Sequence, residues 1–374
     1  MRTLTWEQIN AWRMTQHFLT KRADPPDYLR VVSQIGGLQA QVMSAAELAL
    51  FARVNNIFPS TVQDALWQDR TLVKTWVNRG TLHLVTAADF PVYVAALSTL
   101  RHFESQSWQK YYGVSLEELH LLMDGLQVVL TDSGMTRERL ADSIAEHMKT
   151  PTLRTHLLSG WGGLLKPAAF RGHLCYGPSE GQNVTFVRPT AWIGEWESID
   201  SDEALKEIAR RFLAAYAPAT TDEFARWIGL PVSQAKRTFK NLGDEIEKVN
   251  TNGWEAWMLA SSLKQLESVT ASNIVRLLPL FDPYTIAVAK HYQFIMPPEY
   301  KALVYRNQGW ISAVVLVNGR FEGVWEMDKQ SNRTIITIKM FDSLTKAVGT
   351  GIEAEAQRIG KFLDSEIELA YAEV

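Results

Sequence analysis

The 374-residue sequence contains a single cysteine, Cys175. One thiol cannot close an internal disulfide, and it cannot build a zinc or iron–sulfur site from cysteines alone. The eight histidines show no ligand-like spacing, so we expect neither a metal ion nor another cofactor. These shortages favour a protein of a reducing, cytoplasmic compartment.

Long apolar runs are also missing. The N-terminus has no apolar core of signal-peptide length, and no run in the sequence reaches the roughly 18 residues that a membrane helix requires. Hydrophobic residues make up 46% of the chain and charged residues 21%, which is the balance of an ordinary soluble globular protein. A chain of this length is expected to form two or three compact units rather than one.

Neither sign of charge dominates, because 38 basic and 41 acidic residues give a formal net charge of -3. This balance excludes a protein that coats nucleic acid indiscriminately, so any polyanion site must come from local clustering. The sequence also lacks the motifs of zinc proteases, P-loop NTPases, dithiol redox proteins and dinucleotide-binding dehydrogenases. A glycine–serine–glycine match at residues 177–181 precedes a strand pattern, so it predicts a hairpin tip and not a nucleophilic serine.

Three segments begin with a threonine four residues before a large apolar side chain, as capped helices do. They start at Thr5, Thr136 and Thr220, with Gln8 and Glu223 at the third helical position of the first and the last. Each segment is followed by further helix signals and then by a strand–turn–strand signal, with turns at residues 78–80, 177–181 and 251–253. This order, found three times, is that of a winged helix-turn-helix unit.

From about residue 270 the pattern becomes β-rich. Asn318-Gly319 joins two alternating apolar runs, which is a strong hairpin signal, and a helical pattern closes the chain at residues 344–363. The predicted fold class is α+β, mainly α, with tandem winged helix-turn-helix units followed by a C-terminal β-rich domain. The expected units are 1–115, which carries the Gln-x-Gln motif described below, then 116–198, 199–268 and the β-rich 269–374.

One stretch is unusually basic. Between Glu146 and Glu180 there is no carboxylate. Its fixed positive charges are Lys149, Arg154, Lys166 and Arg171, and its clustered glycines are Gly160, Gly162 and Gly163. Such a stretch predicts contact with the phosphates of DNA, with glycine N–H groups approaching the anion closely. A solvated basic face without any ligand is the alternative.

Gln39 and Gln41 follow the pair Gly36-Gly37 at the end of a helical pattern. Residues two apart diverge on a helix but face the same way in an extended strand, so the glutamines converge only if the glycines break the helix. Their amides do not titrate and cannot act as a general base, but they can hold a water or hydrogen-bond a base edge or a sugar. An ordinary polar turn is the alternative.

Arg79, Thr81 and His83 belong to a strand pattern at residues 75–85, in which Thr81 and His83 share one face. We include these three residues among the candidate DNA-binding residues. A half-buried histidine with satisfied hydrogen bonds is the alternative for His83.

Taken together, three strings resemble the winged-helix DNA glycosylases of the AlkZ and YcaQ type: GGLQAQ at 36–41, TWVNRGTLHLV at 75–85 and LLPLFDPY at 277–284. Their order is the family's order, and the likeness spans essentially the whole chain. The resemblance implies winged-helix units packed into a concave DNA-binding body, followed by a β-domain. It also implies a monofunctional glycosylase that acts on N7-alkylated purines or on their crosslinks in DNA.

The family's pair of polar residues around an apolar one corresponds to Gln39 and Gln41, with Ala40 between them. YcaQ-like members carry an aspartate at the second position, so Gln41 places the chain nearer the AlkZ type. Alkylation at N7 already makes the purine a good leaving group, and two amides then suffice to position a water and orient the sugar. A non-catalytic DNA-binding protein, a regulator or a lesion sensor, is the alternative function. Under either function we expect a monomer that binds double-stranded DNA, without membrane contact, in the cytoplasm at the nucleoid.

Overall fold

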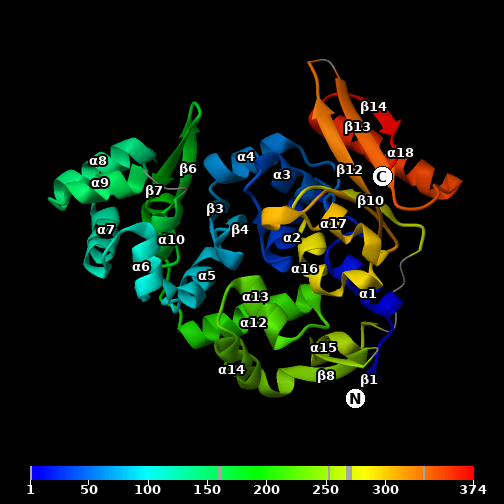
Figure 1. Ribbon diagram of the computed structural model, residues 1–374, viewed down its shortest axis with the longest axis horizontal. Coiled ribbons are helices and arrows are strands. Elements are labelled where there is room, and N and C mark those ends of the chain that lie inside the picture. The colour runs from blue at the N-terminus through cyan, green and yellow to red at the C-terminus, as the bar shows by residue number, and fades with distance from the viewer. Residues whose placement is uncertain (1, 159–161, 252, 267–271, 332) are drawn as a thin grey trace.

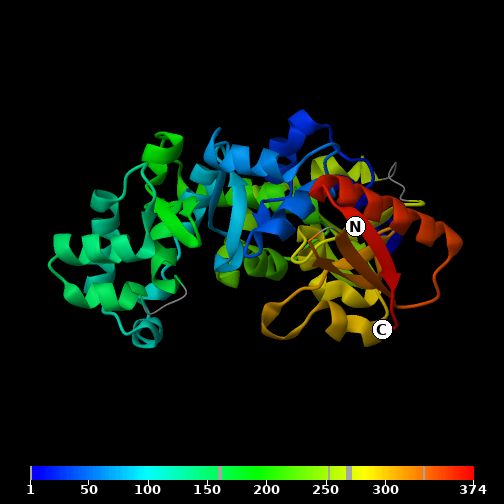
Figure 2. The same cartoon turned by 90° about the horizontal axis from the view of Figure 1, so that it is seen from above.

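The computed structural model describes residues 2–158, 162–251, 253–266, 272–331 and 333–374. Helices and sheets are mixed along the chain, about half of which is helical (Figure 1). The view from above places the helical lobe around α6–α10 at one end of the molecule and the C-terminal sheet with α18 at the other (Figure 2). Within the described residues, no helix combines the length and the apolar character needed to cross a membrane.

The first part of the chain surrounds a small antiparallel sheet in the order β2-β4-β3. Its helices are α1 (Trp6–Gln16), α2 (Tyr28–Gln34), α3 (Met43–Phe51), α4 (Pro59–Trp67) and α5 (Phe90–Leu97). Its strands are β2 (Leu38–Gln39), β3 (Leu72–Trp76) and β4 (Leu82–Thr86). Thr5 forms a capping box with Gln8 at the start of α1, so the predicted helix start and the first predicted hairpin are confirmed.

The next part forms the lobe at the left of Figure 1. Its helices are α6 (Gln106–Tyr112), α7 (Leu116–Val129), α8 (Arg137–His147), α9 (Pro151–Leu158), α10 (Lys166–Ala169) and α11 (Pro189–Ile193). Its strands are β5 (Met135–Thr136), β6 (Cys175–Glu180) and β7 (Asn183–Val187), in the order β5-β7-β6. Thr136 caps α8 as predicted. The strand β7 follows the glycine–serine–glycine match, which confirms a hairpin in place of a nucleophile elbow.

The third part completes its sheet with the N-terminus of the chain. Its helices are α12 (Ser201–Tyr216), α13 (Thr221–Ile228), α14 (Val232–Leu242) and α15 (Ala260–Leu263). The hairpin of β8 (Ile246–Thr251) and β9 (Trp254–Leu259) pairs in parallel with β1 (Arg2–Thr3). Thr220 and Glu223 form the predicted capping box on α13. The first residues of the chain therefore join a sheet that lies more than 240 residues away in sequence.

The C-terminal part contains a five-stranded sheet in chain order. Its strands are β10 (Val275–Leu278), β11 (Val314–Val317), β12 (Arg320–Lys329), β13 (Arg333–Met340) and β14 (Glu366–Tyr371). Its helices are α16 (Pro283–Ala287), α17 (Lys301–Val304) and α18 (Lys346–Leu363). The β11–β12 hairpin and the closing helix confirm the prediction, whereas β14, which α18 places parallel to β13, was not predicted.

Two contacts fix these parts against one another. Trp76 of β3 packs on Tyr176 of β6 with ring centroids 5.0 Å apart, so the first and second hairpins lie side by side. Arg53, after α3, donates two hydrogen bonds to the carboxylate of Asp282 at 2.7 and 2.8 Å. Both side chains are fully buried. This ion pair joins the N-terminal helices to the start of α16, where Asp282 also accepts a hydrogen bond from the backbone N–H of Tyr284.

Candidate functional site

The glycine pair ends the second helix as predicted. After α2, Gly36 and Gly37 adopt φ angles of +72° and +94°, which only glycine adopts readily, and the chain then enters β2. The carbonyl of Gly36 accepts hydrogen bonds from Asn78 Nδ2 at 2.9 Å and from the Tyr93 hydroxyl at 3.0 Å. The break is therefore held from two sides, and it places the following residues in extended backbone.

Gln39 and Gln41 converge, as extended backbone requires. Gln39 Nε2 donates to Gln41 Oε1 at 2.9 Å. Gln39 pairs with His83 across the β2–β4 ladder and is only 7% exposed, whereas Gln41 is exposed. One end of the pair therefore lies inside the protein and the other faces solvent.

Arg79 reaches the pair from the turn between β3 and β4. Its Nη2 donates to Gln39 Oε1 at 2.8 Å. The backbone of Arg79 has φ +59°, a conformation that side chains other than glycine, asparagine and aspartate seldom adopt. Burial lowers the pKa of Arg79 below its usual value, and the positive charge of Arg226 lowers it further. The residue predicted to bind DNA thus also contacts the candidate catalytic pair.

Thr81 and His83 lie on the same side of the strand, as predicted. The carbonyl of Thr81 lies 3.0 Å from His83 Nδ1, and because a carbonyl only accepts, Nδ1 carries the proton and Nε2 is the acceptor. Burial and the nearby Arg79 lower the pKa of His83 to about 3. At neutral pH this ring is therefore an uncharged group beside the glutamine pair.

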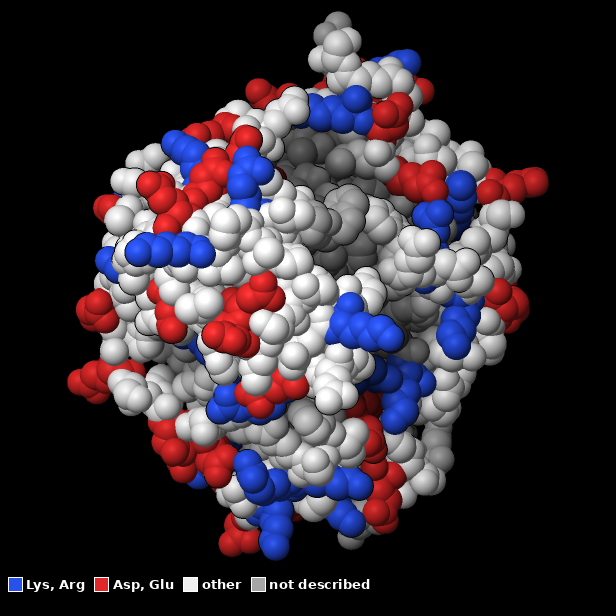
Figure 3. Space-filling model, turned by 60° about the vertical axis from the view of Figure 1, so that its left-hand side comes forward, with Lys and Arg blue, Asp and Glu red and all other residues white. Residues whose placement is uncertain are grey.

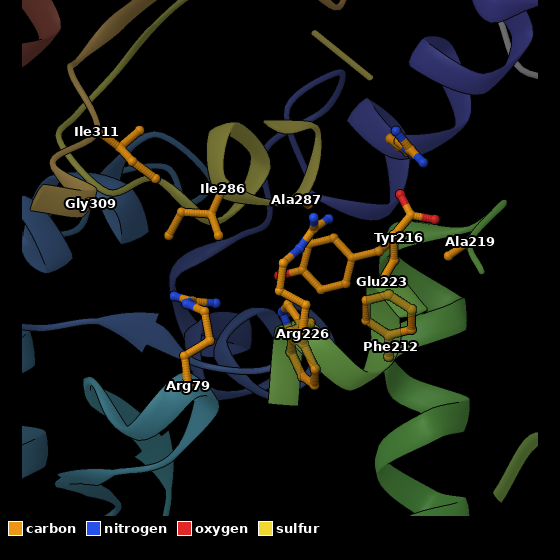
Figure 4. A pocket seen from close by; sticks show the side chains of 12 residues that line it. Arg79, Phe212, Tyr216, Ala219, Glu223, Arg226, Ile286, Ala287, Gly309 and Ile311 are labelled. Atoms are coloured by element: carbon orange, nitrogen blue, oxygen red, sulfur yellow. The ribbon is translucent and has the colours of Figure 1, made fainter. Parts of the chain in front are cut away.

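Two adjoining cavities border this cluster. The larger has a volume of about 240 Å³ and receives side chains from several elements (Figure 4). Its walls include Arg13, Arg79, Phe212, Tyr216, Glu223, Arg226, Trp227, Ile286 and Ile311. The smaller, about 10 Å³, is lined among others by Gln39, Asn78, Arg79, His83 and Tyr216. Asn78 Oδ1 is buried there and has no hydrogen-bond partner among the described residues.

Most residues that line the larger cavity carry no signal in the sequence. Arg226 and Trp227 come from α13, Tyr216 from α12 and Ile286 from α16, and no local pattern marks these residues as neighbours of a glutamine pair. Glu223 was noted only as part of a capping box. Burial alone raises the pKa of Glu223, but hydrogen bonds from His291 and from the backbone of Thr220 lower it to about 2.

The fold does not gather the basic stretch into one patch. Arg154 pairs with Asp142 of α8 at 2.5 Å. Arg171 donates to the carbonyls of Pro167 and Leu100 and stacks on Phe103. Two of the four predicted charges are therefore engaged within the protein. Carboxylates outside the sequence window are brought next to it by the fold.

Lys149 and Lys166 are placed differently. Lys149 is exposed at the end of α8, and no ion pair involves it among the described residues. Lys166 is half-buried, and its Nζ lies 3.7 Å from where a Cβ on Gly80 would stand, beside the turn that carries Arg79. Lys166 is thus the member of the basic stretch that lies beside this turn. The space-filling view shows acidic and basic side chains interspersed over this face, and side chains of both signs stand around a hollow (Figure 3).

The glycines of the basic stretch serve packing. A Cβ on Gly162 would lie 3.1 Å from Trp76, and one on Gly163 only 2.2 Å from the Tyr112 hydroxyl. Gly160 lies outside the described residues. Aromatic side chains therefore account for glycine at these two positions, and the close approach of an anion to their N–H groups stays a prediction. Within the described residues, no group of three or more histidine, cysteine, aspartate or glutamate side chains is arranged to hold a metal ion.

Comparison with known proteins gives a consistent set of matches. A family model described as DNA glycosylase AlkZ-like matches residues 32–362. A curated protein of Streptomyces sahachiroi, named interstrand DNA cross-link repair glycosylase, is 32% identical over 362 residues, which is 96% of each chain. The solved structure of Streptomyces sahachiroi DNA glycosylase AlkZ superposes with a TM-score of 0.90 and 30% identity, and covers 100% of both chains.

Proposed function

This chain belongs to the AlkZ-like DNA glycosylase family, and from that premise we propose that it hydrolyses the N-glycosidic bond of N7-alkylated purines in double-stranded DNA. We propose interstrand DNA crosslinks as a second class of substrate, because the Streptomyces sahachiroi relative is named an interstrand DNA cross-link repair glycosylase. The observation that carries the proposal is the hydrogen-bonded pair Gln39–Gln41, held from inside by Arg79 and exposed at Gln41.

The reaction needs little general acid or base catalysis from Gln39 and Gln41. An N7-alkylated purine carries a positive charge, so it leaves readily while the sugar gains oxocarbenium character. The remaining tasks are to hold a water beneath the anomeric carbon and to orient the sugar, and amide groups do both by hydrogen bonding. Gln41, the exposed member, is the one that meets the nucleotide in this proposal.

The two cavities support this assignment. The smaller has about the size of one water molecule, and its lining includes the polar groups of Gln39, Asn78 and His83. The larger has room for a purine, and the rings of Tyr216 and Trp227 offer it a stacking surface. Extrusion of a base into such a pocket costs a few kcal/mol, and a damaged base lowers that cost.

Within this proposal, we interpret the three hairpins as the wings of three winged-helix units, bounded as predicted at 1–115, 116–198 and 199–268. The paired helices α8 with α9 and α13 with α14, each followed by a hairpin, support the interpretation for the second and third units. The enzyme acts as a monomer on duplex DNA in the cytoplasm, at the nucleoid, and Lys149 and Lys166 contact phosphates.

The test is release of free base from a duplex carrying a single N7-methylguanine, measured at neutral pH with EDTA present. We expect the wild-type protein to release the base faster than spontaneous depurination does. The double variant Gln39→Ala/Gln41→Ala should be slower by about ten- to a thousandfold, or about 1.4 to 4 kcal/mol of barrier. Gln41→Asp should stay closer to wild type than Gln41→Ala, because a carboxylate still accepts the hydrogen bond from Gln39.

Gln357→Ala, at an exposed glutamine of α18, is the matched control and should behave as wild type. All variants should bind undamaged duplex with similar affinity. If the double alanine variant releases the base as fast as wild type, the glutamines form an ordinary polar turn and the mechanism fails. If no protein releases base but duplex is still bound, a non-catalytic DNA-binding protein is the correct description.

A further inference from the structure

The hydrogen bonds around the glutamine pair form a chain in which Arg79 donates to Gln39 and Gln39 donates to Gln41. Arg79 Nη2 lies 2.8 Å from Gln39 Oε1, and Gln39 Nε2 lies 2.9 Å from Gln41 Oε1. A guanidinium can only donate hydrogen bonds, so it accepts only the oxygen end of the Gln39 amide as its neighbour. That choice turns the nitrogen end of Gln39 toward Gln41, which in turn must present its oxygen.

The order of burial gives this chain of bonds an inner and an outer end. Arg79 is half-buried, Gln39 is 7% exposed, and Gln41 is exposed. Because the inner bonds consume Gln39 Oε1 and one N–H of Gln39, the outward groups are the amide NH₂ of Gln41 and the second lone pair of its oxygen. If Gln39 had a neighbour that could also accept hydrogen bonds, both amides could rotate by 180°. The oxygen and the NH₂ of Gln41 would then exchange places.

The surrounding backbone holds Arg79 in the position from which it donates to Gln39. Its left-handed backbone, with φ +59°, belongs to the turn between β3 and β4. On one side of the turn, Asn78 donates to the carbonyl of Gly36 at 2.9 Å. On the other, a Cβ on Gly229 would lie 3.3 Å from the Cα of Arg79. From this turn the side chain points into the larger cavity (Figure 4). A strained backbone of this kind persists only where its surroundings enforce it.

We propose that Arg79 is a positioning residue that fixes the orientation of both amides, so that Gln41 presents its NH₂ and one oxygen lone pair to the nucleotide. The proposal rests on the proposed glycosylase function, which it deepens. Arg226 borders the same cavity and carries the same charge, but no hydrogen bond joins it to either glutamine among the described residues. The contribution of charge can therefore be separated from that of orientation.

The experiment compares Arg79→Met, Arg79→Lys and the charge-matched Arg226→Met. Base release from the N7-methylguanine duplex is followed in single-turnover reactions with saturating enzyme, and duplex affinity is measured separately. Arg226→Met reports what the loss of one charge costs. Arg79→Met should be slower than Arg226→Met by about 10- to 100-fold at saturation, with a comparable change in duplex affinity. Arg79→Lys, which still donates without accepting, should recover part of the rate.

Two isosteric substitutions test the direction of the bonds. Gln41→Glu keeps an acceptor for Gln39 Nε2 and leaves an oxygen lone pair in the outward position, but it loses the outward NH₂. It should therefore lose part of the rate, and less than Gln39→Glu, which displaces both outward groups. Gln39→Glu can no longer donate to residue 41, so Gln41 must turn its NH₂ inward, and the rate should fall at least as far as in Arg79→Met. Equal rates for these two variants would overturn the proposal, as would equal rates for Arg79→Met and Arg226→Met.

A spectroscopic reading does not depend on activity. The side-chain amide resonances of Gln39, assigned by their loss in Gln39→Ala, should shift in Arg79→Met and stay in place in Arg226→Met. Unshifted resonances in Arg79→Met would overturn the positioning role even if the enzyme were active. Shifted resonances in a protein that releases no base would support the positioning role and reject the glycosylase function. Chemical rescue gives a further reading: added guanidinium should accelerate Arg79→Ala but not Gln39→Ala, and the absence of that effect would contradict the proposal.

Discussion

Single residues decide the chemistry that is open to this site. Neither glutamine titrates, and the pKa values of three ionisable side chains beside them are shifted away from neutral pH. Burial and Arg79 lower the pKa of His83 to about 3, and hydrogen bonds lower that of Glu223 to about 2. Burial raises the pKa of Tyr216 well above its usual value. The site is therefore a set of fixed charges and neutral hydrogen-bonding groups.

The rate of base release should accordingly be independent of pH between about 5 and 9. A histidine with a lowered pKa gains its proton only as pH falls toward that pKa, so His83 keeps its neutral form throughout this range. The arginines stay charged over the same range. Single-turnover rates, corrected for spontaneous depurination at each pH, provide the measurement. A rate that titrates between about pH 5 and 9 would contradict this expectation and would require a proton-transferring group at the site.

At the scale of elements, buried contacts hold the site together from several segments. The β3–β4 turn supplies Arg79, the break after α2 supplies the glutamines, and α16 closes one side of both cavities. The start of α16 is fixed by the ion pair between Arg53 and Asp282. Because both partners are fully buried, the pair is costly to break, although it need not stabilise the fold relative to an apolar pair.

Asp282→Asn should destabilise the protein by about 3 kcal/mol, since Arg53 is left as a buried charge without its counter-charge. The variant keeps an oxygen that can still accept from the N–H of Tyr284. Urea unfolding provides the measurement. The double variant Arg53→Met/Asp282→Leu should be more stable than Asp282→Asn, because it removes both buried charges.

Asp27→Asn is the control for this prediction. It removes one charge from an ion pair with Arg30 that is equally short but exposed, and its unfolding midpoint should match wild type. If Asp282→Asn were as stable as this control, the buried pair would not fix α16.

At the scale of the whole molecule, charge is redistributed by the fold. The sequence window without carboxylates becomes a surface on which Asp142 lies beside Arg154, and Arg171 donates hydrogen bonds to two backbone carbonyls. Lys149 stays exposed, and Lys166 lies beside the turn of Arg79. The four basic residues of this window should therefore differ in how much each contributes to DNA binding.

The salt dependence of duplex binding tests this unevenness. Replacing Lys166 by alanine should flatten the slope of log affinity against log salt by about 0.9, the value for one lost phosphate contact. Replacing Arg171 should leave the slope unchanged and lower stability, because its donors and its stacking on Phe103 serve packing. Equal slope changes at both positions would mean that Arg171 leaves its internal partners to bind DNA.

Local signals in the sequence were sufficient for most elements. The threonine caps of α1, α8 and α13 are contacts within four residues, and the hairpins depend on turn residues and alternation. The strand β14 escaped prediction because its residues alternate with charge on an exposed edge and its pairing depends on the crossover through α18. Strand β1 escaped it for a related reason, since its partner β8 is distant in sequence.

The sequence by itself determined the convergence of Gln39 and Gln41, because two adjacent glycines end a helix locally and extended backbone then directs residues two apart to the same side. The tertiary structure alone decided what surrounds them. Arg79 stands 40 residues from Gln39, and the walls of the larger cavity come from α12, α13 and α16. The physical reason is that a hydrogen bond or a cavity wall depends on distance in space, and local periodicity carries no information about which distant segments will meet.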